Sequence, residues 1–348
     1  MRDEGVQPLS YDTTPGRLSA RLRVLATTDV HMQLVGHGYV ADRASGHHGL
    51  AGIATLVDQA RKEAAAEHRA TVLLDNGDLV QGTALGSWVA RQQVTKTHPI
   101  AKALNLMRYD AVGLGNHDLD YGLPYLKRLA RHLNMPMISS NLHQQELAPI
   151  VPYALIDCPL PDTPNHVLRV GVLSVLPEQP AVWNRHVLQG SAQVTPALSC
   201  LEKAVPQMRA LGADLIVLLA HMVIEEPGNP CALRDSALPL AKVPGVDAII
   251  TGHTHRRFPG GDHHPAEDID TKGGTLARCP ASMPGYAASD LAVLDLTLNH
   301  THREGWTVIG HVSRLVPNTP QTPASPAIVA ACAAAHDATR ADLATPIA

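Results

Sequence analysis

Short apolar segments that end abruptly in polar residues recur along this chain, and they constrain its fold more than any other feature of the sequence. They are rich in Leu, Val and Ile and lie at residues 22–28, 71–76, 111–116, 136–141, 167–176, 214–221 and 247–253. Near-continuous apolar runs of this length are typical of strands buried on both faces of a sheet. Helical patterns lie between them, at 52–68, 123–133 and 197–212. Strands that alternate with helices predict βαβ units and a largely parallel sheet.

The pattern changes in the C-terminal part of the chain. Residues 291–299 and 305–316 are successive apolar segments around a polar turn, which predicts an antiparallel pair of strands. A Pro/Thr-rich linker follows at 316–326, and residues 327–343 are mostly strong helix formers. We therefore expect three parts, which are a polar N-terminal segment at 1–20, a folded domain at 21–316, and a linker with a connector helix at 317–348.

Side chains that can bind metals stand where five of the predicted strands end. In an open α/β sheet, ligands bind at the carboxyl ends of the strands, where the following loops converge. We therefore expect these side chains to meet in one metal centre. They are Asp29, His31, Asp78, Asn116, His221, His253 and His255.

The donor atoms of this set indicate which metals it can hold. Four imidazoles, two carboxylates and one amide oxygen suit Zn²⁺, Mn²⁺, Fe or Co²⁺, whereas Ca²⁺ and Mg²⁺ prefer oxygen alone. Seven ligands are too many for one tetrahedral site and fit two divalent ions that share a bridging ligand. Asp78 is the natural bridge, because the flanking Gly77 allows backbone and metals to approach closely.

The charge of such a centre favours a phosphate substrate. Two divalent ions against two carboxylates leave about +2, or about +1 with a bridging hydroxide, and this charge attracts a phosphate ester and stabilises its transition state. His117 and Asp120 stand three residues apart beside Asn116. A carboxylate that orients an imidazole keeps it protonated, so we interpret His117 as the general acid or as a cation that stabilises the transition state, and Asp120 as its orienter.

The overall composition excludes some partners. The formal net charge is −4, from 28 basic and 32 acidic residues, so no basic field would draw the chain to a nucleic acid polymer or a membrane. The N-terminal segment lacks the apolar stretch of a secretory signal. We therefore expect a cytoplasmic protein, or a periplasmic one if a signal was removed.

These motifs resemble the calcineurin-like metallophosphoesterases and, within them, the 5′-nucleotidase family. The stretches that carry the resemblance are LRVLATTDVHMQL, LLDNGDLVQGTALG, GLGNHDLDYGLPYL, VPGVDAIITGHTHRRFPG and MPGYAASDLAVLDLTLN. The resemblance implies a four-layer α/β/β/α sandwich with two mixed sheets. It also implies that Asp29, His31, Asp78 and His255 hold one metal and that Asp78, Asn116, His221 and His253 hold the other, with His117 and Asp120 as the catalytic dyad.

The likeness is closest to the branch that hydrolyses 2′,3′-cyclic nucleotides and 3′-nucleotides, here by attack of a metal-bound hydroxide. Members of the family usually carry a C-terminal nucleotide-binding domain, which we expect to be absent here, so base recognition should be weak. Two alternatives stay open: a 5′-nucleotidase or nucleotide-sugar hydrolase on the same centre, and a non-catalytic binding module. Residues 283–290 are either a loop near the site or a turn before the next strand.

Overall fold

A computed structural model describes residues 18–46, 49–92, 97–144, 146–163, 166–178, 192–224 and 235–345. Most of the expected polar segment 1–20 thus lies outside the described residues. The first of its two large sheets has the strand order β17-β16-β1-β4-β5. Strands β1 (Leu18–Thr27), β4 (Ala70–Asp75) and β5 (Ala111–Val112) run parallel. The expected antiparallel pair, β16 (Asp290–Thr301) and β17 (Gly305–Pro317), extends this sheet beside β1.

The second sheet has the order β13-β14-β15-β11-β10-β8-β7, with β12 paired to β15 off this path. Its parallel centre is formed by β8 (Val167–Val175), β10 (Leu215–Ala220), β11 (Ala248–Thr251) and β15 (Cys279–Pro284). Its antiparallel members are β7 (Ala154–Pro159), β12 (Arg257–Phe258), β13 (Ile269–Asp270) and β14 (Thr275–Leu276). Two small antiparallel pairs stand apart, β2 (His37–Gly38) with β3 (Arg43–Ala44) and β6 (Leu142–His143) with β9 (Gln193–Val194).

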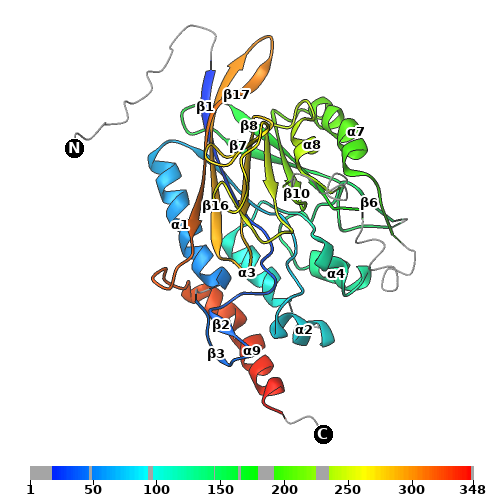
Figure 1. Ribbon diagram of the computed structural model, residues 1–348, viewed down its shortest axis with the longest axis vertical. Coiled ribbons are helices and arrows are strands. Elements are labelled where there is room, and N and C mark those ends of the chain that lie inside the picture. Colours follow the sequence, from blue (N-terminus) through cyan, green and yellow to red (C-terminus); the bar gives the residue numbers. More distant parts are fainter. Residues whose placement is uncertain are drawn as a thin grey trace, which may run out of the picture.

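Helices cover the outer face of each sheet (Figure 1). On the first sheet these are α1 (Gly49–Ala66), α2 (Ala84–Arg91), α3 (Pro99–Met107), α4 (Leu123–Ala130) and α9 (Pro326–Leu343). On the second sheet they are α7 (Ala197–Ala210) and α8 (Leu238–Ala241). No helix in the described ranges is both long and apolar enough to span a bilayer.

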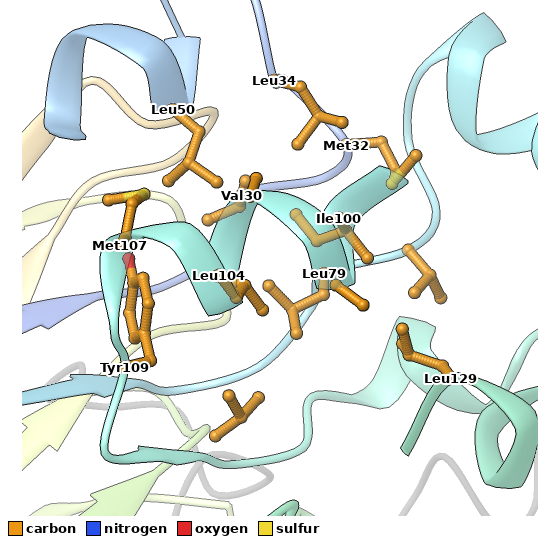
Figure 2. Packing of buried hydrophobic residues seen from close by; sticks show 14 of the residues in the cluster. Val30, Met32, Leu34, Leu50, Leu79, Ile100, Leu104, Met107, Tyr109 and Leu129 are labelled. Atoms are coloured by element: carbon orange, nitrogen blue, oxygen red, sulfur yellow. The ribbon is translucent and has the colours of Figure 1, made fainter. Parts of the chain in front are cut away.

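Three apolar cores separate the layers. The first lies between the outer helices and the first sheet, and Figure 2 shows Leu50 of α1 and Ile100 and Leu104 of α3 in it. The second joins the facing sides of the two sheets, for example Val24 and Val172. The third lies between the second sheet and α7 and α8. Helix, sheet, sheet and helix thus form the four-layer α/β/β/α sandwich with two mixed sheets that the resemblance implied.

The prediction of one largely parallel sheet, which came from periodicity, is wrong, because the strands form two large sheets. Strands of both sheets are covered on both faces, so their apolar runs do not tell which sheet they join. The segment 136–141 forms only isolated bridges, Val112 with Met137 and Ile138 with Val151. The strand expected at 111–116 ends at Val112, because the chain then turns toward the loop that carries Asp78. A Cβ on Gly115 would lie 2.1 Å from Oδ1 of that carboxylate.

Candidate metal centre

The loops after β1 and β4 lie against each other and carry the first predicted ligands. The amide of Asp29 donates to the carbonyl of Gly77 across 2.9 Å, and the amide of His31 donates to that of Asp78 across 2.9 Å. Gly77 has φ +90°, and a Cβ there would lie 2.1 Å from the amide nitrogen of Gly115. This loop therefore requires glycine, as expected from the sequence, because the strand-end loops approach so closely.

Five of the seven predicted ligands have a left-handed backbone. Their φ values are 50° for Asp29, 49° for His31, 57° for Asp78, 73° for His253 and 60° for His255. Such a conformation costs a residue with a Cβ roughly 1–2 kcal/mol. Strained backbone of this kind concentrates at functional sites, where the surrounding structure enforces it.

The first group of donor atoms surrounds the carboxylate of Asp29. Its Oδ1 lies 3.8 Å from Nε2 of His31 and 3.4 Å from Nε2 of His255. The two imidazole nitrogens are 3.1 Å apart, and Nε2 of His31 is 3.9 Å from Oδ2 of Asp78. Donor atoms that converge this closely from separate loops can bind one cation.

The second group surrounds His221, which is fully buried at the end of β10. Its Nε2 lies 3.1 Å from Oδ2 of Asp78 and 3.7 Å from Oδ1 of Asp29. The ring of His253 is 5.5 Å from that of His221, and its Nδ1 lies 2.7 Å from Oδ1 of Asn116. The structure thus brings all seven predicted side chains together, and the carboxylates of Asp29 and Asp78 both lie 3.1–3.9 Å from imidazoles of the two groups.

Two histidines direct Nε2 into the cluster, because a backbone carbonyl holds Nδ1 of each ring. Nδ1 of His31 donates to the carbonyl of Gln81 across 2.6 Å, and Nδ1 of His221 donates to that of Asn76 across 2.8 Å. Such a contact is the usual support of a metal-binding imidazole. Nε2 of His221 is buried 3.1 Å from Oδ2 of Asp78 and 3.7 Å from Oδ1 of Asp29. A buried imidazole nitrogen this close to two carboxylates fits a metal ligand.

The electrostatics of the cluster also fit a cation. Burial lowers the pKa of His221, but the carboxylates of Asp78 and Asp29 outweigh burial and raise it. Burial and His221 together lower the pKa of His253 to about 4. The buried carboxylates therefore draw positive charge onto one imidazole and leave the other neutral. Divalent ions at the same place would supply that charge.

His117 and Asp120 form the predicted pair beside the cluster. Nδ1 of His117 donates to Oδ2 of Asp120 across 2.8 Å, and the hydrogen bond from this carboxylate raises the pKa of His117. The ring of His117 is 5.6 Å from that of His31, and its amide donates to Oδ1 of Asp78 across 2.7 Å. The imidazole, 40% exposed, therefore stands at the open side of the centre.

Asp118 has a structural role that no sequence pattern indicated. It is fully buried, and four backbone amides donate to it, those of Gly115 and Asp78 to Oδ2 and those of Leu79 and Val80 to Oδ1, at 2.8–3.3 Å. One carboxylate thus ties the 3₁₀ turn Asn116–Leu119 to the loop that carries Asp78. The GNHD motif contained the residue, but three of its four donors lie about 40 residues earlier in the chain.

The loop at 283–290 lies at the site, which decides between its two interpretations. The amide of Ala287 donates to the carbonyl of Asp29 across 2.7 Å. The ring of Tyr286 stacks on that of His255, with centroids 4.6 Å apart. Arg257, which follows the last ligand, pairs with Asp290 through Nε and Oδ2 at 2.7 Å.

This fold and this cluster define a class of hydrolase, and comparison with known families agrees. The model of the calcineurin-like phosphoesterases matches residues 22–257, and the chain belongs to that family. It is 35% identical over 293 residues to the 2′,3′-cyclic-nucleotide 2′-phosphodiesterase/3′-nucleotidase of Yersinia enterocolitica, covering 82% of this chain and 44% of that protein. A protein of the same name from Haemophilus influenzae is 35% identical over 308 residues, covering 87% of this chain and 46% of that protein.

Among solved structures, the calcineurin-like phosphoesterase YfkN from Bacillus subtilis superimposes with a TM-score of 0.86 at 29% sequence identity. The match covers 94% of this chain and 100% of that one. The chain thus spans the whole of one solved phosphoesterase chain and less than half the length of the curated relatives named above.

Proposed function

We propose that residues 21–316 form the catalytic domain of a metal-dependent phosphoesterase that hydrolyses 2′,3′-cyclic nucleotides and 3′-nucleotides. The observation that carries this proposal is the convergence of seven metal-binding side chains on one edge of the sheets, with an oriented imidazole beside them. The substrate class is that of the relatives from Yersinia and Haemophilus, to which the chain is similar over more than four fifths of its length.

Two divalent ions would share this site, with Asp78 as the common ligand. Asp29, His31 and His255 would complete the first ligand set, which the contacts of 3.4 and 3.8 Å around Oδ1 of Asp29 support. Asn116, His221 and His253 would complete the second, which the short contacts of Asp78 with His221 and of Asn116 with His253 support. Bound there, Zn²⁺, Mn²⁺, Co²⁺ or Fe ions would neutralise the phosphate and lower the pKa of the attacking water.

His117 would deliver the proton that the leaving oxygen needs. Asp120 holds Nδ1, so Nε2 is the nitrogen left to face the substrate. With a cyclic substrate, water adds to phosphorus, the P–O2′ bond breaks and the 2′ oxygen takes the proton from His117. With a 3′-nucleotide the P–O3′ bond breaks in the same way. The raised pKa of His117 favours the protonated form that this role requires.

The test compares substrates on one purified sample. Metal-free protein would be supplied with Mn²⁺, Zn²⁺ or Co²⁺ and assayed on 2′,3′-cAMP, 3′-AMP and 5′-AMP. We expect the first two to be hydrolysed faster than 5′-AMP. Faster hydrolysis of 5′-AMP would indicate a 5′-nucleotidase instead. If folded, metal-loaded protein hydrolysed no phosphate ester, the chain would be a non-catalytic binding module.

A further inference from the structure

His255 differs from the other imidazoles of the cluster in how its ring is held. Nδ1 of His31 and Nδ1 of His221 are each fixed by a backbone carbonyl. In the described part of the chain, no group forms a hydrogen bond with Nδ1 of His255. Its side chain is also 41% exposed, against 10% for that of His31 and 0% for that of His221. An exposed ring without this contact needs another support if it is to ligate a metal.

Tyr286 supplies such a support. Its ring lies almost parallel to the imidazole of His255, with an interplanar angle of 7° and centroids 4.6 Å apart. His31 meets the same imidazole edge-on, at 5.0 Å and 71°. Two aromatic contacts of different geometry restrict rotation of the His255 ring, and each such contact contributes roughly 0.5–1.5 kcal/mol beyond buried area.

The loop that carries Tyr286 is anchored to the metal-binding loops themselves. The amide of Ala287 donates to the carbonyl of Asp29, and the amide of Gly285 donates to that of Arg256 across 3.1 Å. Nδ2 of Asn318 donates to the carbonyl of Ala288 across 2.9 Å. The backbone attachments on both sides of Tyr286 therefore keep its ring in register with His255.

The backbone of this loop is strained to keep that position. Gly285, Ala287 and Ala288 have φ values of 70°, 53° and 60°, and the two alanines carry a Cβ in this left-handed region. A single such residue costs roughly 1–2 kcal/mol. Alanine keeps such a conformation only where the surrounding contacts enforce it, and these contacts fix the backbone that carries Tyr286.

We propose that Tyr286 is a positioning residue for His255, which it holds by stacking in the orientation that binds a metal. The inference rests on the proposed function, because it requires that His255 is a ligand. The aromatic ring carries the role and the phenolic hydroxyl does not. Phenylalanine should therefore replace Tyr286 without loss, whereas alanine should release the imidazole.

The test measures metal affinity directly, by calorimetric titration of the metal-free full-length chain with Zn²⁺. Wild type and Tyr286→Phe should each bind two ions, and the affinity for each ion should be the same in both proteins. Tyr286→Ala should bind one of them 10–100-fold more weakly, the usual effect of removing a group that supports a ligand. Tyr153→Ala serves as the control, because Tyr153 is a partly exposed tyrosine at the edge of the second sheet, 37% exposed against 49% for Tyr286.

If the alanine variant fails to fold, Tyr286→Leu can replace it, because leucine retains apolar bulk. This variant should also bind one of the two ions more weakly than wild type. Equal affinity in wild type and Tyr286→Ala would overturn the inference alone, as would an equal loss in Tyr286→Phe. If Tyr286→Ala raised the KM for 2′,3′-cAMP but left metal affinity unchanged, Tyr286 would contact the substrate, and the inference would also be overturned. Wild-type protein that binds no metal would overturn the proposed function and the inference together.

Discussion

Nδ1 of His117 donates to Oδ2 of Asp120 across 2.8 Å, and this hydrogen bond determines which nitrogen of the imidazole is left to act on a substrate. If His117 protonates the leaving oxygen, its importance depends on how basic that oxygen is. His117→Ala should lower kcat on 3′-AMP about 10²–10⁴-fold, the usual contribution of general acid catalysis. The loss should be much smaller for p-nitrophenyl esters, whose leaving group needs little protonation.

Asp120→Asn provides the matched change in the orienting carboxylate. It should show the same difference between substrates with a smaller loss, because the imidazole stays in place. Metal content, measured by elemental analysis, should be unchanged in both variants. Equal losses on both kinds of ester would remove His117 from the role of general acid.

Asp118 should be needed for folding and for the shape of the centre. Asp118→Ala leaves four backbone amides without their acceptor inside the protein. Each unsatisfied buried donor costs about 1–3 kcal/mol, so we expect a loss of about 3 kcal/mol or more in the free energy of unfolding. Urea denaturation of the metal-free protein would measure it, with the part-exposed Asp120→Ala as control. Similar midpoints for the two variants would contradict this role.

Arg23 and Asp295 should stabilise the first sheet as a pair. They lie opposite each other in β1 and β16 and form two hydrogen bonds, of 2.6 and 2.8 Å, with both side chains buried. Removal of Asp295 leaves the buried guanidinium with the part-exposed Glu63 and Glu67 alone, and removal of Arg23 leaves the buried carboxylate 4.0 Å from Arg69. Either change should therefore cost up to about 3–5 kcal/mol. The double variant Arg23→Met/Asp295→Val should cost less than the sum by up to about 3 kcal/mol. Additive losses in a double-mutant cycle would show that the two charges act independently.

His98 should make the fold sensitive to acid. It lies at the start of α3, where Nδ1 accepts from the amide of Ile100 and Nε2 donates to the hydroxyl of Tyr125, and burial lowers its pKa to about 3. His132, whose Nδ1 accepts from the amide of His98, also disfavours the charged form. His98 therefore stays neutral in the folded state at a pH where it is protonated in the unfolded chain, in which its pKa has the ordinary value of about 6.5.

Stability should consequently fall as the pH drops from about 6.5 toward 4, because only the unfolded chain gains this proton. His98→Asn retains an acceptor for the amide of Ile100 and removes the titrating group. Its free energy of unfolding should fall less steeply than that of wild type, by up to about 1.4 kcal/mol per pH unit. Parallel curves from urea denaturation between pH 4 and 7 would contradict this assignment.

The sequence predicted which polar side chains converge at one edge better than it predicted the sheets. Asp29, Asp78 and His253 could be found because strand ends of an α/β fold converge at one edge, whatever the sheet order. The division into two sheets could not be read from periodicity, since Val24 and Val172 lie in equally apolar runs of different sheets and are both buried in the middle core. The family resemblance supplied that division.

Residues that act through long-range contacts were not predicted either. Asp118 looks like one more polar residue of a turn until the loop that carries Asp78 is brought against it. The ring of Tyr286 stacks on His255 from a loop in which Ala287 and Ala288 have left-handed conformations, which alanine rarely adopts and which no local sequence pattern predicts.

Metal dependence can be tested by a titration of the metal-free protein with Mn²⁺ or Zn²⁺ that follows bound metal and hydrolysis of 2′,3′-cAMP in the same samples. We expect two ions per chain, with activity absent without metal and complete when both are bound. Hydrolysis that persists after chelation, or full activity in a variant such as His221→Ala that has lost a predicted ligand, would contradict this expectation.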